Sequence, residues 1–194
     1  MEALIKEIKQ CKLCEPHLPL GANPVFQISP TSKLLIIGQA PGTKVHQTSI
    51  PWNDPSGDRL RDWLEMDKEA FYNSENISIV PMGLCYPGKG RSGDLPPRPE
   101  CAPQWHDIIL KQLTQVQLIL LIGQYSQQYY LKESGLTAQY KTLTERVKHF
   151  AECPGIFFPL PHPSPRNQIW LKKNPWFYKE CLPALRERVQ QALG

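Results

Sequence analysis

The sequence contains no apolar run long enough to cross a membrane, and its start, Met1 to Lys12, carries charges at helical spacing instead of the apolar segment of a signal peptide. It also contains no internal repeat and no low-complexity tail. We therefore expect a cytoplasmic protein with no membrane partner. A reducing compartment argues against a framework of disulfide bonds.

A strong charge of either sign is missing as well. The formal net charge is +4 and the isoelectric point is ≈ 8.7, which permits binding to nucleic acid without indicating it. The 194 residues are enough to bury a core and fall within the usual size of one domain. We expect a single domain over residues 1–194, acting as a monomer.

Four of the six cysteines are spaced as metal ligands. Cys11-Lys-Leu-Cys14 is a short pair that suits zinc, an iron–sulfur cluster or a redox disulfide equally well. Cys85 and Cys101 flank a stretch rich in Pro and Gly, which predicts an irregular loop able to fold back around a metal. Four thiolates suit a tetrahedral zinc or a cubane iron–sulfur cluster, and reduced thiols in the core are the alternative.

The other two cysteines, Cys153 and Cys181, have no such partners, and we expect both to be buried as apolar residues. The 20 prolines predict a surface rich in loops. Pro175-Trp176-Phe177 predicts packing of the last helix.

Short apolar runs bounded by turn residues alternate with segments of helical periodicity. This alternation is typical of an α/β protein, here a three-layer α/β/α sandwich with a central, mainly parallel, four-stranded sheet. The predicted strands are Lys33 to Gly38, Ile77 to Met82, Leu118 to Gly123 and Ile156 to Leu160.

Parallel sheets bind ligands at the carboxyl ends of their strands. The loops that leave three of these ends, Gln39 to Pro55, Gly83 to Arg98 and Pro161 to Pro175, hold the unusual residues of this chain. The first begins with Gly38-Gln39-Ala40-Pro41-Gly42, whose glycines let the backbone approach a ligand, and a plain turn is the alternative.

Two further features lie near these loops. Ser56 is expected to cap a helix whose first turn carries Asp58. In the last loop, prolines on both sides of His162 hold its backbone rigid, as a preorganised site requires.

Gly38-Gln39-Ala40-Pro41-Gly42 and His162-Pro163-Ser164-Pro165-Arg166-Asn167 resemble the two signature motifs of the uracil-DNA glycosylase superfamily. The cysteine pattern resembles its iron–sulfur family 4 branch, and the second motif resembles that of the single-strand-selective monofunctional uracil glycosylases. The resemblance runs from Cys11 to about Trp176. It implies a uracil-DNA glycosylase-like fold, DNA carrying a deaminated base as partner, and a [4Fe–4S] cluster, with zinc as the alternative occupant, on Cys11, Cys14, Cys85 and Cys101.

Motif matching also implies roles for single residues, beside the substrate-binding turn from Gly38 to Gly42. Trp52 stands where family 4 has a Phe that stacks on the flipped base. The alternative is a Trp buried in the core with its N–H hydrogen-bonded. His162 matches the histidine that hydrogen-bonds the base carbonyl as negative charge grows there. Ser164 is a candidate phosphate ligand and Arg166 a candidate wedge in the base stack, with Asn167 extending the same loop.

Gln39 departs from the family pattern, which has a Glu here to orient the attacking water or to stabilise the sugar cation. An amide holds a water but does not take its proton at neutral pH. His46, in the same loop where family 4 usually has an acidic residue, is the candidate replacement, and a solvated loop histidine is the alternative.

Pro81 is a second departure, because family 4 has an Asn here that reads the uracil edge. Proline has no side-chain donor, so base selection would fall to backbone groups near Met82 and Gly83 or to another loop. A broader activity on deaminated bases, a different lesion and a lost activity all stay open.

The implied function is a monofunctional DNA glycosylase that hydrolyses the N-glycosidic bond of uracil or a related deaminated base and leaves an abasic site, as in base excision repair. No lysine stands where a Schiff-base nucleophile is expected, so we expect no strand cleavage. The alternatives are a non-catalytic nucleic-acid-binding module and covalent capture of the abasic sugar by His46. The expected DNA contacts include Lys89, Arg91 and Arg98, with Lys172 and Lys173 beside the second motif.

Overall fold

The protein, described here from a computed structural model over residues 1–91 and 93–194, is built on a single sheet of four strands. All three strand pairs are parallel, in the order β2-β1-β3-β4. The prediction of an α/β sandwich with a parallel sheet is therefore confirmed. The strands are β1 (Leu34–Ile37), β2 (Ile77–Ile79), β3 (Leu118–Ile122) and β4 (Phe157–Leu160).

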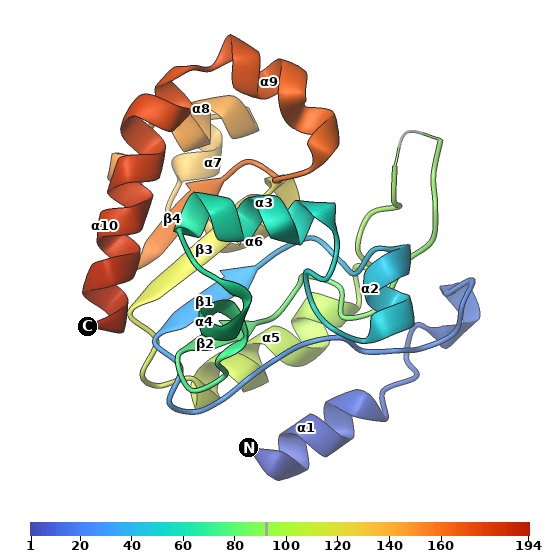
Figure 1. Ribbon diagram of the computed structural model, residues 1–194. Helices are drawn as coiled ribbons and strands as arrows, with labels where there is room; N and C mark the ends of the chain where they lie inside the picture. Colours follow the sequence, from blue (N-terminus) through green and yellow to red (C-terminus); the bar gives the residue numbers. More distant parts are fainter. Residues whose placement is uncertain (92) are drawn as a thin grey trace.

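Helices connect the strands and cover both faces of the sheet, as Figure 1 shows. The α-helices are α1 (Glu2–Lys9), α2 (Thr43–Thr48), α3 (Pro55–Leu64), α4 (Lys68–Tyr72), α5 (Cys101–Gln112), α6 (Gln124–Tyr130), α7 (Leu136–Gln139), α8 (Leu143–Lys148), α9 (Gln168–Lys173) and α10 (Leu182–Leu193). The 3₁₀ turns are η1 (Glu15–His17), η2 (Phe150–Glu152) and η3 (Pro165–Asn167), and the π-helical segment is η4 (Phe177–Cys181).

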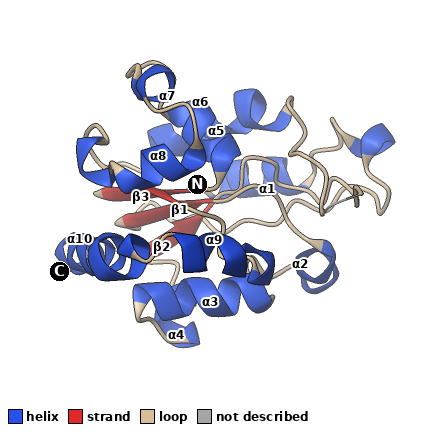
Figure 2. Ribbon diagram, turned by 90° about the horizontal axis from the view of Figure 1, so that it is seen from above, coloured by secondary structure: helices blue, strands red, loops and turns tan. Residues whose placement is uncertain are grey.

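Side chains alternate across the sheet and so divide the core in two. In β1, Leu34 and Ile36 pack with residues of α3, α4 and α10, whereas Leu35 and Ile37 pack with residues of α1 and α5. Figure 2, which looks along the layers, shows these two groups of helices on opposite sides of the strands. Across the described residues, none of the helices has the length and apolar character needed to cross a bilayer.

The observed strands lie inside the predicted ones, and β2 is clearly shorter. Its assigned range ends at Ile79, although the amides of Val80 and Met82 still donate to the carbonyls of Ile36 and Gly38. Pro159 in β4 is tolerated because β4 is an edge strand and needs partners on one side alone.

The packing predictions for the last third of the chain are confirmed. Cys153 and Cys181 are buried free thiols. Phe177 is fully buried, and Trp176 packs against the same core.

The predicted cap of α3 is wrong by two residues. Asp54, not Ser56, is the N-cap, and its Oδ1 accepts a hydrogen bond from the Gly57 amide at 2.8 Å. Pro55 then occupies the first helical position, where its missing N–H is not needed. Asp58 does lie in the first turn, as expected.

Candidate functional site

The loops that leave the carboxyl ends of β1, β2 and β4 surround a cavity of about 510 Å³. Both sequence motifs contribute to its wall, so the fold brings together segments more than a hundred residues apart. A hairpin around Lys89 and Asp94 (residues 88–91 and 93–95) projects beside α2, as Figure 1 shows, and adds to the wall. The predicted site residues that line the cavity are Gly38, Gln39, Ala40, Pro41, Gly42, Trp52, His162, Ser164, Arg166 and Asn167.

Trp52 is held in an unusual conformation at the cavity wall. Its φ is 57°, in the left-handed region that a large side chain rarely adopts. Two glycines make room for it: a Cβ on Gly38 would lie 2.8 Å from Cζ2 of the indole, and one on Gly57 would lie 1.7 Å from the Trp52 carbonyl oxygen. These contacts fix the direction of the indole.

Arg61 and Tyr72 hold the backbone beneath this indole, and the sequence analysis missed both. The Arg61 guanidinium is almost fully buried, and it donates to the Trp52 carbonyl, the Tyr72 hydroxyl and the Asp58 carboxylate. The Tyr72 hydroxyl donates to the Pro51 carbonyl at 2.9 Å. The spacing of Asp58 and Arg61 on one helical face was the available signal.

His162 also lines the cavity and lies beside Trp52, with ring centroids 5.6 Å apart and ring planes tilted by 36°. The Asn167 amide donates to the His162 carbonyl at 2.7 Å and fixes the loop. Burial lowers the pKa of His162, and the Asp54 carboxylate opposes that shift. A neutral imidazole at neutral pH still donates one N–H, which is what a developing oxyanion needs.

Two carboxylates reach the cavity that the sequence analysis did not assign to it, those of Asp54 and Asp94. Both lie near Gly42, where a Cβ would come 3.4 Å from Oδ2 of Asp94 and 4.0 Å from Oδ2 of Asp54. Burial raises the pKa of Asp94 and the Asp54 charge adds to that rise, while Arg166 and Lys89 oppose it. Asp54 is the more rigid of the two because its other oxygen caps α3.

Gln39 lines the cavity, and its side-chain amide donates to the Leu95 carbonyl at 3.2 Å. This bond links the first motif to the hairpin. It uses the NH2 group of the Gln39 side chain and leaves its oxygen available to accept a hydrogen bond. The side chain can therefore hold a water through that oxygen but supplies no charge.

Three of the residues predicted for catalysis or substrate binding do not line the cavity. His46 is absent from its lining, and its ring lies beside Tyr86 with centroids 6.1 Å apart. Met82 and Gly83 are also absent, because their amides donate to the carbonyls of Gly38 and Gln39 at 2.9 and 3.0 Å. These two amides are therefore already paired, and the reading of a base by backbone groups near Met82 and Gly83, or by another loop, stays a prediction, as does the replacement of a carboxylate by His46.

Pro81 itself lines the cavity and is fixed from behind by His106. The Nε2 atom of His106 lies 3.1 Å from the Pro81 carbonyl, and Nδ1 bonds the Tyr130 hydroxyl. Burial lowers the pKa of His106 to about 4. The neutral ring therefore donates from Nε2 to the carbonyl and accepts the phenolic hydrogen at Nδ1.

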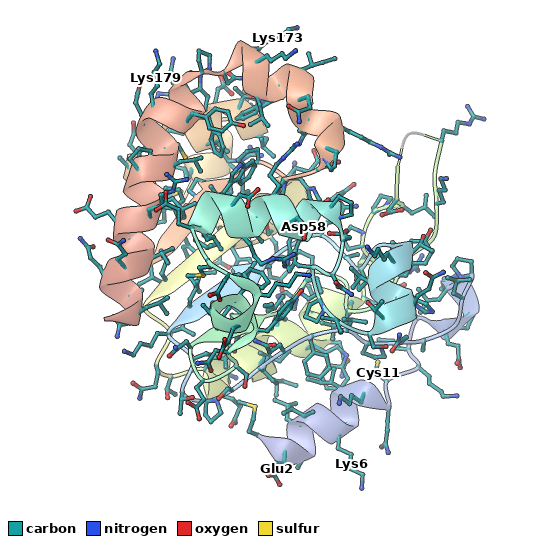
Figure 3. All side chains as sticks on the ribbon, in the orientation of Figure 1. Glu2, Lys6, Cys11, Asp58, Lys173 and Lys179 are labelled. Atoms are coloured by element: carbon teal, nitrogen blue, oxygen red, sulfur yellow. The ribbon has the colours of Figure 1, made fainter. Side chains whose placement is uncertain are left out.

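The predicted DNA contacts are divided between the hairpin and the second motif. Lys89 and Arg91 are exposed on the hairpin, and Arg166 approaches it, with Nη1 3.1 Å from the place of a Cβ on Gly93. Arg98 instead pairs with Glu100 at 2.6 Å. The lysines of α9 lie in its last turn, and Figure 3 shows Lys173 at the end of α9 away from the hairpin.

A second cavity is lined by all four cysteines of the predicted metal site: Cys11, Cys14, Cys85 and Cys101. Cys11 follows the end of α1, as Figure 3 shows, and Cys101 begins α5. Burial and the neighbouring thiols raise the pKa of Cys85 to about 11 and that of Cys101 to about 12. In the part of the chain described, no three His, Cys, Asp or Glu side chains converge as the ligands of a metal ion.

The fold and the first cavity define a parallel α/β protein whose ligand site lies at the carboxyl edge of the sheet and is lined by an aromatic platform and a histidine donor. Residues 25–186 match the family model of the uracil DNA glycosylase superfamily. This match spans most of the chain, so the chain belongs to that superfamily, and our prediction of membership is confirmed. Members of the superfamily act on DNA and generally hydrolyse N-glycosyl bonds. The closer kinship with family 4 stays a prediction.

Proposed function

We propose that this chain is a monofunctional DNA glycosylase that removes uracil or a related altered base from DNA by hydrolysing its N-glycosidic bond. The observation that carries the proposal is a cavity in which an indole platform, a histidine donor and a fixed carboxylate lie together, from Trp52, His162 and Asp54. A flipped base is held by stacking and hydrogen bonds, and a carboxylate can serve as the general base for the attacking water.

Each group has a distinct part in the reaction. Water oxygen bonds to C1′ while the C1′–N bond breaks and its electron pair leaves with the base. The Asp54 carboxylate takes the water proton and balances positive charge on the sugar. The His162 N–H stabilises the negative charge on the base carbonyl. Asp54 thereby supplies the charge that Gln39 lacks.

Base release from labelled single- and double-stranded oligonucleotides under single-turnover conditions tests this proposal. We expect His162→Ala to slow release by about 100-fold or more. Asp54→Asn is expected to slow it by a similar factor, because asparagine keeps the helix cap but cannot take a proton. Asp62→Asn, an exposed position on the same helix, is the matched control and should leave the rate unchanged.

The opposite result identifies the alternative function. A folded protein that binds these oligonucleotides but never releases a base is a binding module, as the uncharged Gln39 would favour. A protein–DNA adduct that survives denaturing electrophoresis would instead indicate covalent capture of the sugar.

We also propose that Cys11, Cys14, Cys85 and Cys101 hold a [4Fe–4S] cluster, with zinc as the alternative occupant. The four thiols support this assignment because they line one cavity. A [4Fe–4S] cluster is held by four cysteine thiolates, so four thiols around a cavity suit it. When bound, the cluster supplies structure and takes no part in the hydrolysis. The cysteines would join the end of α1 to the loop between Cys85 and α5.

A further inference from the structure

Arg59 is a half-buried arginine of α3 that bonds a backbone carbonyl instead of a carboxylate. Its Nη1 atom donates to the Ser164 carbonyl at 2.9 Å. The neighbouring carboxylate, Asp58, pairs with Arg61. In the part of the chain that the structure describes, none of the ion pairs involves Arg59. The contact with Ser164 therefore determines where the guanidinium of Arg59 lies.

The Ser164 carbonyl lies at the turn of the second motif. It also accepts a hydrogen bond from the Asn167 amide at 2.9 Å, which closes the η3 turn. The Asn167 side chain in turn donates to the His162 carbonyl at 2.7 Å. Because these bonds join the loop into one unit, a shift of the Ser164 carbonyl is expected to move His162 with it.

Helix α3 carries the other polar group of the proposed reaction. Asp54 caps this helix through the Gly57 amide, and Arg59 lies about one and a half turns further along it. Figure 2 shows α3 and α9, the helix that follows the second motif, on the same side of the sheet, where Leu60 and Leu171 belong to one core cluster. Apolar packing is non-directional, whereas a charge-assisted hydrogen bond fixes a position.

We infer that Arg59 is a positioning residue that holds the loop of His162 in place relative to the helix of Asp54. The donor to the base and the carboxylate for the water then act on the same nucleotide. The inference rests on the proposed function and deepens it. Since Arg59 acts through a carbonyl of the protein, its loss should slow bond cleavage more than it weakens DNA binding.

Arg59→Met tests the inference, because methionine keeps an unbranched apolar stem and removes every donor. We expect the single-turnover rate constant for base release, measured at saturating protein, to fall by about 10- to 100-fold. The affinity for the same oligonucleotide should stay within about threefold. Arg59→Lys retains a charged donor and should recover most of the rate. The matched control is Arg188→Met, because Arg188 donates to the Gly155 carbonyl before β4, and this change should leave the rate unchanged.

A second comparison separates positioning from a general loss of structure. In a His162→Ala background, Arg59→Met should slow release by less than about threefold, because the donor that it positions is gone. Equal losses with and without His162 would overturn the inference. Thermal unfolding of each variant establishes that it is folded.

The remaining outcomes are equally distinct. In Arg59→Met, weaker DNA binding whose salt dependence falls by about one ion, with an unchanged rate at saturation, would make Arg59 a phosphate ligand and overturn the inference. Release that depends on His162 but not on Arg59 would also overturn it and leave the proposed function standing. If wild-type protein releases none of uracil, hypoxanthine and xanthine, both are overturned.

Discussion

At the scale of single residues, the position of the base platform, the Trp52 indole, depends on the lack of a side chain at Gly38. Gly38 lies against the Trp52 indole so closely that a Cβ would approach Cζ2 to 2.8 Å. Because the Trp52 backbone is fixed at φ 57°, the indole must move within the cavity to relieve that contact. We predict that Gly38→Ala slows single-turnover base release by about 100-fold, since a displacement of about 1 Å has such an effect.

The matched control is the same change beside a smaller ring. In a Trp52→Phe background the clash is relieved, so Gly38→Ala should slow release by a much smaller factor. Equal losses in both backgrounds would show that contact with the indole is not the cause.

The candidate site could be predicted where a residue lies inside a motif, and not where the fold alone brings it in. His162 follows the end of β4, so its place at one edge of the sheet follows from the topology, whereas Trp52 lies beyond α2 and was expected from the family resemblance. Asp94 arrives on a hairpin whose direction no local pattern specifies. Asp54 was missed because Ser56 is an equally good capping residue, and the preference of Pro55 for the first helical position decides between them.

At the scale of secondary structure, helix α3 holds the backbone of Trp52, the base platform, through the buried guanidinium of Arg61. Arg61 bonds the Trp52 carbonyl and Tyr72 and pairs with Asp58 at 2.6 Å. We predict that Arg61→Met, which keeps much of the volume, lowers the free energy of unfolding by about 2 kcal/mol and also slows base release. Urea unfolding and single-turnover release measure the two effects.

Asp58→Asn is the control for that experiment. The Asp58 side chain is 66% exposed, so its loss should change stability by about 0.5 kcal/mol and leave release nearly unchanged. If Asp58→Asn matched Arg61→Met in both measurements, the ion pair and not the backbone clamp would hold the platform.

The contact between α5 and α6 is expected to make stability depend on pH. His106 has an ordinary pKa of 6.5 in the unfolded chain and about 4 when folded. The unfolded state therefore binds more protons in this window, so stability is complete above about pH 6.5 and falls as the pH drops toward 4. The full effect is about 3 kcal/mol.

Urea unfolding at pH 7 and pH 5 measures this dependence. His106→Gln removes the titrating group and should lower the pH dependence, whereas His149→Gln, at a half-buried histidine directly after α8, should leave it as in wild-type protein. An unchanged pH dependence in His106→Gln would assign the effect elsewhere, for example to His162, whose pKa burial also lowers.

The order of strands and helices could be predicted because each strand is a short buried run and segments of helical periodicity separate these runs. The exact ends could not. β2 ends at Ile79 although the amides of Val80 and Met82 still bond the neighbouring segment, and η4 is a π-helical segment just before Pro183, where Phe177 and Cys181 pack into the core.

At the scale of the whole molecule, the two cavities are connected through one stretch of chain. Residues between Cys85 and Cys101 include Asp94, which lines the first cavity, while both cysteines line the second. A cluster at the cysteines would therefore also restrain the wall of the first cavity. Loss of one ligand should affect folding and the site together.

We predict that Cys85→Ala yields unstable, colourless protein, whereas His162→Ala folds normally and keeps the brown colour of a cluster. The matched control is Cys153→Ala, at a buried thiol outside the second cavity. It should keep the colour and lower the free energy of unfolding by about 1–2 kcal/mol, because it leaves a small unfilled volume.

Iron, sulfide and zinc analysis with visible absorbance measures the occupant. One zinc and no iron in wild-type protein would overturn the cluster and retain the site. Metal-free wild-type protein that is stable and unaffected by Cys85→Ala would show that the four thiols are simply core residues.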